Sequence, residues 1–315
     1  TKLNFSQLTA TDYLATSDYM NQEPMTDFGV IDDSLRKRIV DNARTEISYN
    51  ADVFAAIDNP DYQLIHPTDV SNSNLNRLRQ EMAVEALCTL RENPDERLYY
   101  LEAPTGGGKT NISMLVAAML LEMDKSLNKL LYVFPFTTLA TQTQRAMVKT
   151  YGLEEYEVAE IHGKAPFYSK EVPESVKNET EADAIYGKAR RDHLRYQFFH
   201  FPVALVTHVR FFGWLTTNWK EDNYVYHRLA GSIVIIDELQ AYNPKHWDKV
   251  IYFLDEFSRY FNCRFVLMSA TLPKLGELLG EGLPLPLPLI PNARRYLTNP
   301  NFAGRITFDF GLLYN

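Results

Sequence analysis

A glycine-rich run that ends in a lysine and a threonine is the most chemically distinctive feature of this sequence. It reads Ala-Pro-Thr-Gly-Gly-Gly-Lys-Thr over residues 103–110, between an apolar run at 98–101 and an apolar helical stretch at 112–121. Successive glycines let the backbone wrap phosphate groups with its N–H donors, and the positive end of the following helix adds to the attraction. The run therefore predicts a loop that binds the phosphates of a nucleotide.

The polar side chains of this loop have expected roles. Lys109 is placed to reach the β- and γ-phosphates of ATP, and the hydroxyl of Thr110 is placed to ligate Mg²⁺. The other loop residues expected to contact the nucleotide are Thr105, Gly106, Gly107 and Gly108. Ala103 stands where the usual pattern has its first glycine. A glycine-rich turn without nucleotide is the alternative interpretation.

Two carboxylates follow an apolar run much later in the chain. The run 233–236 is followed by Asp237, Glu238 and, two positions further, Gln240. Ligands of open α/β sheets gather at the carboxyl ends of parallel strands, so we expect these acids to meet the phosphate loop over neighbouring strand ends. Asp237 is expected to hold Mg²⁺ through water, and Glu238 to orient and polarise the attacking water. Acids after a strand are otherwise ordinary solvated loop residues.

Hydroxyl side chains mark the end of another apolar run, at 264–268. Ser269 and Thr271 follow it, separated by one alanine. Three small residues alone suggest only a capped turn. Because they come after the other two motifs in sequence order, we expect their hydroxyls to relay the state of the nucleotide to the closure of two domains.

The residues that could contact nucleic acid carry a less specific signal. Thr137 and Thr138 precede a helix whose N-terminus can hold a backbone phosphate, although an ordinary helix cap explains them equally well. Thr207, His208 and Arg210 end the next strand, and the aromatic residues after them either stack on bases or fill the core. These five residues are predicted to contact nucleic acid.

The motifs need a scaffold, and short apolar runs that alternate with helical stretches indicate one. The runs are 98–101, 130–134, 203–206, 233–236 and 264–268. This alternation predicts an α/β domain over 74–283, in which a parallel sheet is covered by helices on both faces. A small helical segment over 1–73 precedes it, and a charged insertion over 154–196 interrupts it. Prolines then predict a stiff connector within 284–315, a range that also includes the start of a second domain.

Composition limits the classes of protein that fit. Among the 315 residues, 45% are hydrophobic, and no stretch reaches the roughly 18 uninterrupted apolar residues of a membrane span. Cys88 and Cys263 are too far apart to suggest a disulfide framework or a zinc site, so a cytoplasmic location fits best. The net charge of −8 does not favour general nucleic-acid binding, but it does not exclude a local groove that binds nucleic acid. We expect the chain to be a fragment, because it opens at Thr1 and stops within a strand-like run.

The ordered motifs resemble those of superfamily 2 helicases and, more narrowly, the helicase–nuclease of type I CRISPR interference. The segment 237–240 resembles the acidic box of that family, which places Gln240 in the catalytic set. The segment 75–80 resembles the stretch before the phosphate loop, so Gln80 is expected to read the adenine. The resemblance implies a RecA-like P-loop fold and ATP-driven 3′-to-5′ movement on single-stranded DNA. It also implies recruitment by an RNA-guided CRISPR surveillance complex.

The N-terminal segment resembles a second part of the same family. Residues 8–16 look like the last helix of its HD nuclease domain, in which an aspartate is a metal ligand. The resemblance implies that Asp12 belongs to a site for divalent transition metals whose other ligands lie upstream, whereas a lone helical aspartate usually faces solvent. Other superfamily 2 motors that act on RNA or DNA, in repair or restriction, remain open. A noncatalytic interaction module that keeps the fold also remains open.

The isolated 315-residue chain is expected to bind Mg-ATP weakly and to hydrolyse it very slowly. Motor ATPases of this kind usually complete the site with an arginine from a second domain, which stabilises charge on the transferred phosphoryl group. Phosphate release measured at steady state, with Lys109→Ala as the control, checks this. Rapid turnover that disappears in Lys109→Ala would contradict it.

Overall fold

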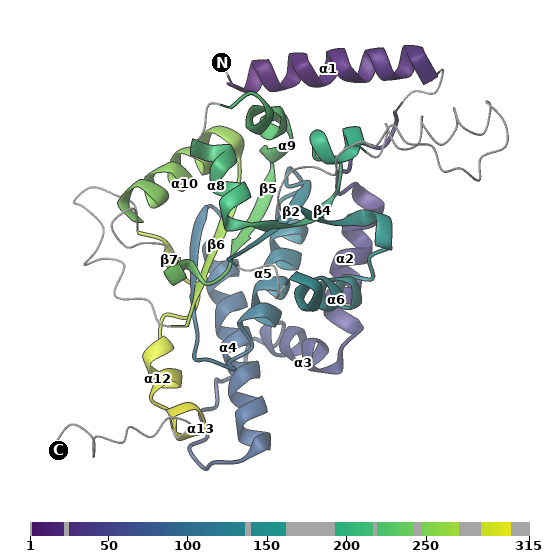
Figure 1. Cartoon of the computed structure of the whole chain (residues 1–315). Helices are drawn as coiled ribbons and strands as arrows, with labels where there is room; N and C mark the ends of the chain where they lie inside the picture. The colour runs from purple at the N-terminus through teal and green to yellow at the C-terminus, as the bar shows by residue number, and fades with distance from the viewer. Residues whose placement is uncertain are drawn as a thin grey trace, which may run out of the picture.

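The computed structural model of the chain describes residues 2–21, 25–135, 140–161, 193–216, 219–241, 247–270 and 285–303. Seven strands in these ranges form one sheet, in the order β3-β4-β2-β5-β6-β1-β7 (Figure 1). The strands are β1 Leu98–Glu102, β2 Lys129–Phe134, β3 Val158–Ile161, β4 Val203–Thr207, β5 Ser232–Ile236, β6 Arg264–Ser269 and β7 Leu287–Pro288. Every pairing is parallel, so all the carboxyl ends lie on the same side of the sheet.

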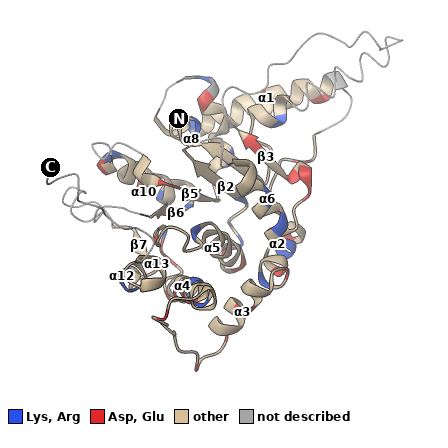
Figure 2. Cartoon of the chain, turned by 60° about the horizontal axis from the view of Figure 1, so that its bottom comes forward, with Lys and Arg blue, Asp and Glu red and all other residues tan. Residues whose placement is uncertain are grey.

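Helices cover both faces of this sheet, and the alternation of side chains along each strand supplies both cores. In β2, Tyr132 and Phe134 pack into one hydrophobic cluster, whereas Leu131 and Val133 pack into the other. The first cluster is completed by α2 Asp33–Thr45, α3 Ser48–Ile57, α4 Asn72–Glu92, α5 Lys109–Met123 and α6 Ala140–Tyr151. The second is completed by α8 His208–Thr216, α9 Tyr226–Leu229 and α10 Trp247–Phe261. In Figure 2 the central strands are mostly tan, and the charged positions lie mainly on the surrounding helices.

The predicted parallel sheet with helices on both faces is confirmed. The five apolar runs correspond to β1, β2, β4, β5 and β6, each within one residue of its predicted ends. Two strands were not anticipated. Edge strand β3 follows the turn η2 Glu155–Glu157 within the charged insertion, and β7 lies within the proline-rich connector and pairs with β1.

The segments on either side of the predicted motor domain share its core. Helices α2 and α3 contribute buried side chains to the cluster that contains α4 and α5. After β7, the short helices α12 Ala293–Leu297 and α13 Pro300–Ala303 add Tyr296 and Phe302 to the same cluster. The predicted boundaries at residues 73 and 283 therefore separate segments that pack on one continuous core.

Helix α1 Lys2–Asn21 lies across the top of the molecule in Figure 1, above α9. It is attached to α9 and to the turn η3 Glu221–Val225. The buried hydroxyl of Ser6 donates to the carbonyl of Tyr224 at 2.7 Å, and the ring of Tyr13 lies edge-on to Phe198 with 5.5 Å between centroids. Among the described helices, none has both the length and the apolar character needed to cross a membrane.

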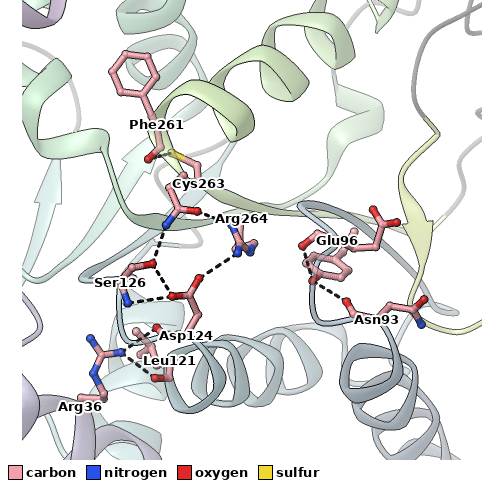
Figure 3. Close-up of polar contacts among 11 residues, drawn as sticks. Arg36, Asn93, Glu96, Leu121, Asp124, Ser126, Phe261, Cys263 and Arg264 are labelled. Carbon is pink, nitrogen blue, oxygen red and sulfur yellow. Dashed lines mark hydrogen bonds and ion pairs between the residues drawn. The ribbon is translucent and has the colours of Figure 1, made fainter.

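Helix α5 carries the phosphate loop at its N-terminus, and Arg36 holds its opposite end (Figure 3). The buried Arg36 guanidinium donates to the carbonyls of Leu121 at 2.8 Å and Leu127 at 2.6 Å, and to two more in the same turn. In that turn, Asp124 pairs with Arg264 at the start of β6, at 3.0 Å. These contacts satisfy carbonyl groups that a helix C-terminus leaves without partners.

Replacing Arg36 with methionine is expected to lower the free energy of unfolding by about 2–3 kcal/mol, because buried carbonyls lose a charged donor. Denaturant unfolding measures this. Lys37→Met is the matched control on the same helix, since Lys37 is 77% exposed and pairs with Asp41 one turn away. The control is expected to change stability by less than about 0.5 kcal/mol. Equal effects of the two substitutions would contradict the role of Arg36.

Candidate nucleotide-binding site

The phosphate loop and the acidic residues meet on the carboxyl-terminal side of the sheet, but not over adjacent strands. Strand β6 lies between β1, which leads into the loop, and β5, which leads into Asp237. The expectation of neighbouring strand ends was therefore wrong. The register pairs Glu102 with Ser269 and Ile236 with Leu267, so the three strands end at nearly the same level. The loop and the acids consequently converge across the end of β6.

The glycines of the loop adopt the backbone shape that its sequence requires. Gly106 and Gly108 have φ angles of 76° and 86°, in the left-handed region that favours glycine. Gly107 donates its N–H to the carbonyl of Pro104 at 2.8 Å, and a Cβ atom on Gly107 would lie 2.8 Å from that same oxygen. No side chain caps the N-terminus of α5. An uncapped helix start behind such a loop suits the binding of phosphate oxygens.

Lys109 opens α5 and lies near both acidic side chains. Its Nζ donates to the carbonyl of Ala103 at 3.4 Å. Burial lowers the pKa of Lys109, and the carboxylates of Glu238 and Asp237 oppose this effect. The half-buried ammonium group therefore lies near two negative charges, and its own positive charge is available to phosphate oxygens at the loop.

The carboxylate of Asp237 is held at both oxygens. Oδ2 accepts a hydrogen bond from the phenol of Tyr132 at 2.8 Å, and Oδ1 accepts one from the backbone N–H of Glu238 at 2.9 Å. The side chain of Thr110 lies close to the same phenol and acts to lower its pKa. Burial raises the pKa of Asp237, whereas the hydrogen bond from Tyr132 acts to lower it. The imidazole of His208 lies 2.9 Å from the backbone carbonyl of Asp237.

The side chains of Thr110 and Asp237 form the donor set expected of a magnesium site. They supply a hydroxyl and a carboxylate, which are oxygen ligands of the kind that Mg²⁺ prefers, and the phenol of Tyr132 donates to the carboxylate. The residues present therefore fit a bound Mg²⁺ between the loop and the acids.

Glu238 has a strained backbone and a defined side-chain partner. Its φ angle of 50° is in the left-handed region, which is uncommon for a residue with a side chain and is often found at functional sites. The amide of Gln240 donates to its carboxylate, and the hydroxyl of Ser269 donates to the Gln240 carbonyl oxygen at 2.6 Å. The structure thus links the predicted catalytic acid to Ser269 through Gln240. Thr271 lies outside the described residues.

Helix α4 contacts the phosphate loop through Arg79. The guanidinium of Arg79 donates through Nε to the carbonyl of Gly106 at 2.7 Å and through Nη1 to Asn76 at 2.9 Å. Gln80 is the next residue on this helix and is half-buried. Its contact with adenine stays a prediction, and the contact of Arg79 with the loop was not anticipated.

The residues predicted to contact nucleic acid have structural partners where they are described. His208 is 4% exposed, and the hydroxyl of Thr207 accepts from the backbone N–H of Arg210 at 3.3 Å. Arg210 pairs with Asp222 at 2.8 Å and lies 5.7 Å from the centre of the Trp214 ring. Thr137 and Thr138 lie outside the described residues. A role in nucleic-acid binding stays a prediction for all five.

Asp12 lies on the exposed side of α1. Within the described part of the chain, no group of three or more His, Cys, Asp or Glu residues is arranged to hold a metal ion. A role for Asp12 as a ligand of a nuclease metal stays a prediction.

The site occupies the region in which the chain matches a known family. Residues 78–278 match the model of the DEAD/DEAH box helicases, a span that runs from α4 past β6. The chain belongs to this family. The predicted fold class, a RecA-like P-loop domain, is thereby confirmed, and the parallel sheet agrees with it. Among curated proteins, none matches this chain.

Solved structures of other helicases are similar to the DEAD/DEAH chain at low identity. The DUF1998 helicase MrfA is 19% identical, over 64% of this chain and 29% of MrfA, with a TM-score of 0.40. T. fusca Cas3 with ATP is 18% identical, over 77% of this chain and 25% of Cas3, with a TM-score of 0.44. The UvsW helicase from bacteriophage T4 is 14% identical, over 78% of this chain and 90% of UvsW, with a TM-score of 0.35. The chain thus spans less than a third of MrfA and of Cas3.

Replacing Gly107 with alanine is expected to weaken ATP binding about tenfold or more. The added Cβ would lie 2.8 Å from the Pro104 carbonyl oxygen and 3.1 Å from the end of Met82, so the loop must shift. Such overpacking costs about 1–3 kcal/mol, and 1.4 kcal/mol corresponds to a factor of ten in affinity. Fluorescent-nucleotide titration measures the change.

Gly213→Ala is the matched control, because its added Cβ would have only an ordinary contact with Asp222 at 3.9 Å. It is expected to leave nucleotide affinity unchanged. If Gly107→Ala binds ATP as tightly as the control does, the loop does not contact phosphate in the predicted way.

Proposed function

We propose that this chain is the first motor domain of an ATP-driven helicase or translocase that binds Mg-ATP between the phosphate loop and the acidic residues. The observation that carries the proposal is the convergence of Lys109, Asp237 and Glu238 at one site. Lys109 is close enough to both carboxylates for their negative charges to act on its pKa. The family match covers all of these residues. A noncatalytic module would have no need of this complete set.

The residues divide the work of phosphoryl transfer. The backbone of the glycine loop and the ammonium of Lys109 bind the phosphate chain and attract its developing negative charge. Thr110 and Asp237 would hold Mg²⁺, which neutralises charge on the phosphates when it is bound. Glu238 orients and polarises the attacking water, and the Gln240 amide directs its carboxylate.

The contacts from Glu238 through Gln240 to Ser269 would couple ATP hydrolysis to the movement of the two domains. Gln240 contacts both side chains, so a change at the Glu238 carboxylate on hydrolysis alters the partners available to Ser269 at the end of β6. Ser269 and Thr271 pass this change to a second motor domain, which supplies an arginine to the site and closes over the nucleotide.

The proposed track is single-stranded DNA, and the proposed setting is type I CRISPR interference. The acidic box, the segment 75–80 and the segments 161–163 and 206–212 support this reading through their resemblance to the helicase–nuclease of that system. Thr137, Thr138, Thr207, His208 and Arg210 would line the path of the strand. In this proposal the cytoplasmic protein is recruited by an RNA-guided surveillance complex, and Asp12 belongs to an HD nuclease domain with its own transition metals.

The test is ATP hydrolysis by the full-length protein in the presence of single-stranded DNA, duplex DNA or single-stranded RNA of one sequence. Single-stranded DNA is expected to stimulate hydrolysis at least about tenfold, and Lys109→Ala is expected to abolish it. Stimulation by RNA alone would identify an RNA helicase and overturn the DNA proposal. Absence of both nucleotide binding and hydrolysis would leave an interaction module that keeps the fold.

A further inference from the structure

Tyr132 places a hydroxyl group in the middle of an apolar strand, directly below the candidate site. The side chain is 1% exposed and belongs to the hydrophobic cluster between the sheet and α5. Its strand, β2, pairs with β5, and the register places Tyr132 beside Ile235, two residues before Asp237. A hydroxyl in such a position is costly to bury unless it has hydrogen-bond partners.

The partner of this hydroxyl is a residue of the candidate magnesium site. The phenol donates to Asp237 Oδ2 at 2.8 Å, and the side chain of Thr110 lies close to the same phenol. One residue from β2 thereby restrains the carboxylate that follows β5. The other oxygen of Asp237 is held by the backbone N–H of Glu238 at 2.9 Å. The carboxylate is therefore restrained at both ends.

Other buried tyrosines of the chain use their hydroxyls differently. The phenol of Tyr151 donates to the backbone carbonyl of Met114 in α5 at 2.8 Å, and that of Tyr99 donates to the carbonyl of Glu96 at 2.7 Å. Those bonds join elements of the scaffold and involve no residue of the candidate site. Tyr132 differs because its partner is the carboxylate proposed to hold Mg²⁺.

We propose that Tyr132 is a positioning residue that holds the Asp237 carboxylate in the arrangement that receives the magnesium ion of the bound nucleotide. The inference rests on the proposed function, because it requires the chain to bind Mg-nucleotide. The phenol occupies one lone-pair direction of Oδ2 and leaves the others available, since each carboxylate oxygen accepts more than one hydrogen bond or water contact. Without the phenol, the carboxylate keeps only its hydrogen bond from the backbone N–H of Glu238, and binding of the ion must supply the lost restraint.

Tyr132→Phe tests this role, because phenylalanine fills the same space and lacks only the hydroxyl. Affinity for ADP is measured by calorimetry in the full-length protein, once with excess Mg²⁺ and once with EDTA. The ratio of the affinity in Mg²⁺ to the affinity in EDTA is expected to fall about tenfold in Tyr132→Phe, as for the loss of one hydrogen bond to a charged group. The affinity in EDTA is expected to be unchanged. Tyr151→Phe is the matched control and is expected to keep the wild-type ratio.

A double-mutant cycle with Asp237→Asn separates positioning from general loss of structure. If Tyr132 acts through Asp237, the double variant is expected to show no greater loss of the Mg²⁺-dependent ratio than Asp237→Asn alone. Additive losses would overturn the inference. An unchanged ratio in Tyr132→Phe, or equal weakening with and without Mg²⁺, would also overturn it. Wild-type protein that binds no ADP would instead reject the proposed function itself.

Discussion

The parallel register of β1, β6 and β5 is the constraint on which the candidate site depends. Because the three strands run in one direction and end at nearly the same level, the loop after β1 and the acids after β5 leave the sheet on the same side. A shift of β6 by one residue would turn its side chains to the opposite face and disturb both cores. The same pairing places Ser269 between the loop and the acids, where it reaches Gln240.

The charged groups of the site are partly removed from water, which costs free energy, and neighbouring polar groups offset this cost. Asp237 and Lys109 are both half-buried. Burial raises the pKa of Asp237 and lowers the pKa of Lys109, so it favours the neutral form of each side chain. Their proximity and the donors around Asp237 oppose this effect. The strained backbone of Glu238 is tolerated because its neighbours hold it in place, with Asp237 on one side and Gln240 on the other. Such restraint before a ligand arrives reduces the ordering that binding must accomplish.

Much of this fold could be predicted from the sequence because its central strands are unbroken apolar runs. The phosphate loop was also predictable, since glycines and Lys109 before an apolar helix have few other uses. The edge strands were missed for physical reasons: β3 contains Glu160 among acidic neighbours, and β7 contains proline. The role of Tyr132 could not be predicted, because an aromatic residue within an apolar run suggests core packing. Its phenol reaches Asp237 only because β2 pairs with β5. Arg79 was missed for a similar reason, since its contact with Gly106 depends on how α4 packs.

The short strand β7 affects whether a second copy of the chain could add a strand to the sheet. Leu289 donates its N–H inward to the carbonyl of Tyr100, and successive positions of a strand point to opposite sides, so the exposed Pro288 occupies an outward position. Proline has no N–H to offer an incoming strand. An approaching chain would thus find a donor missing at this strand, which discourages self-association and fibril growth there.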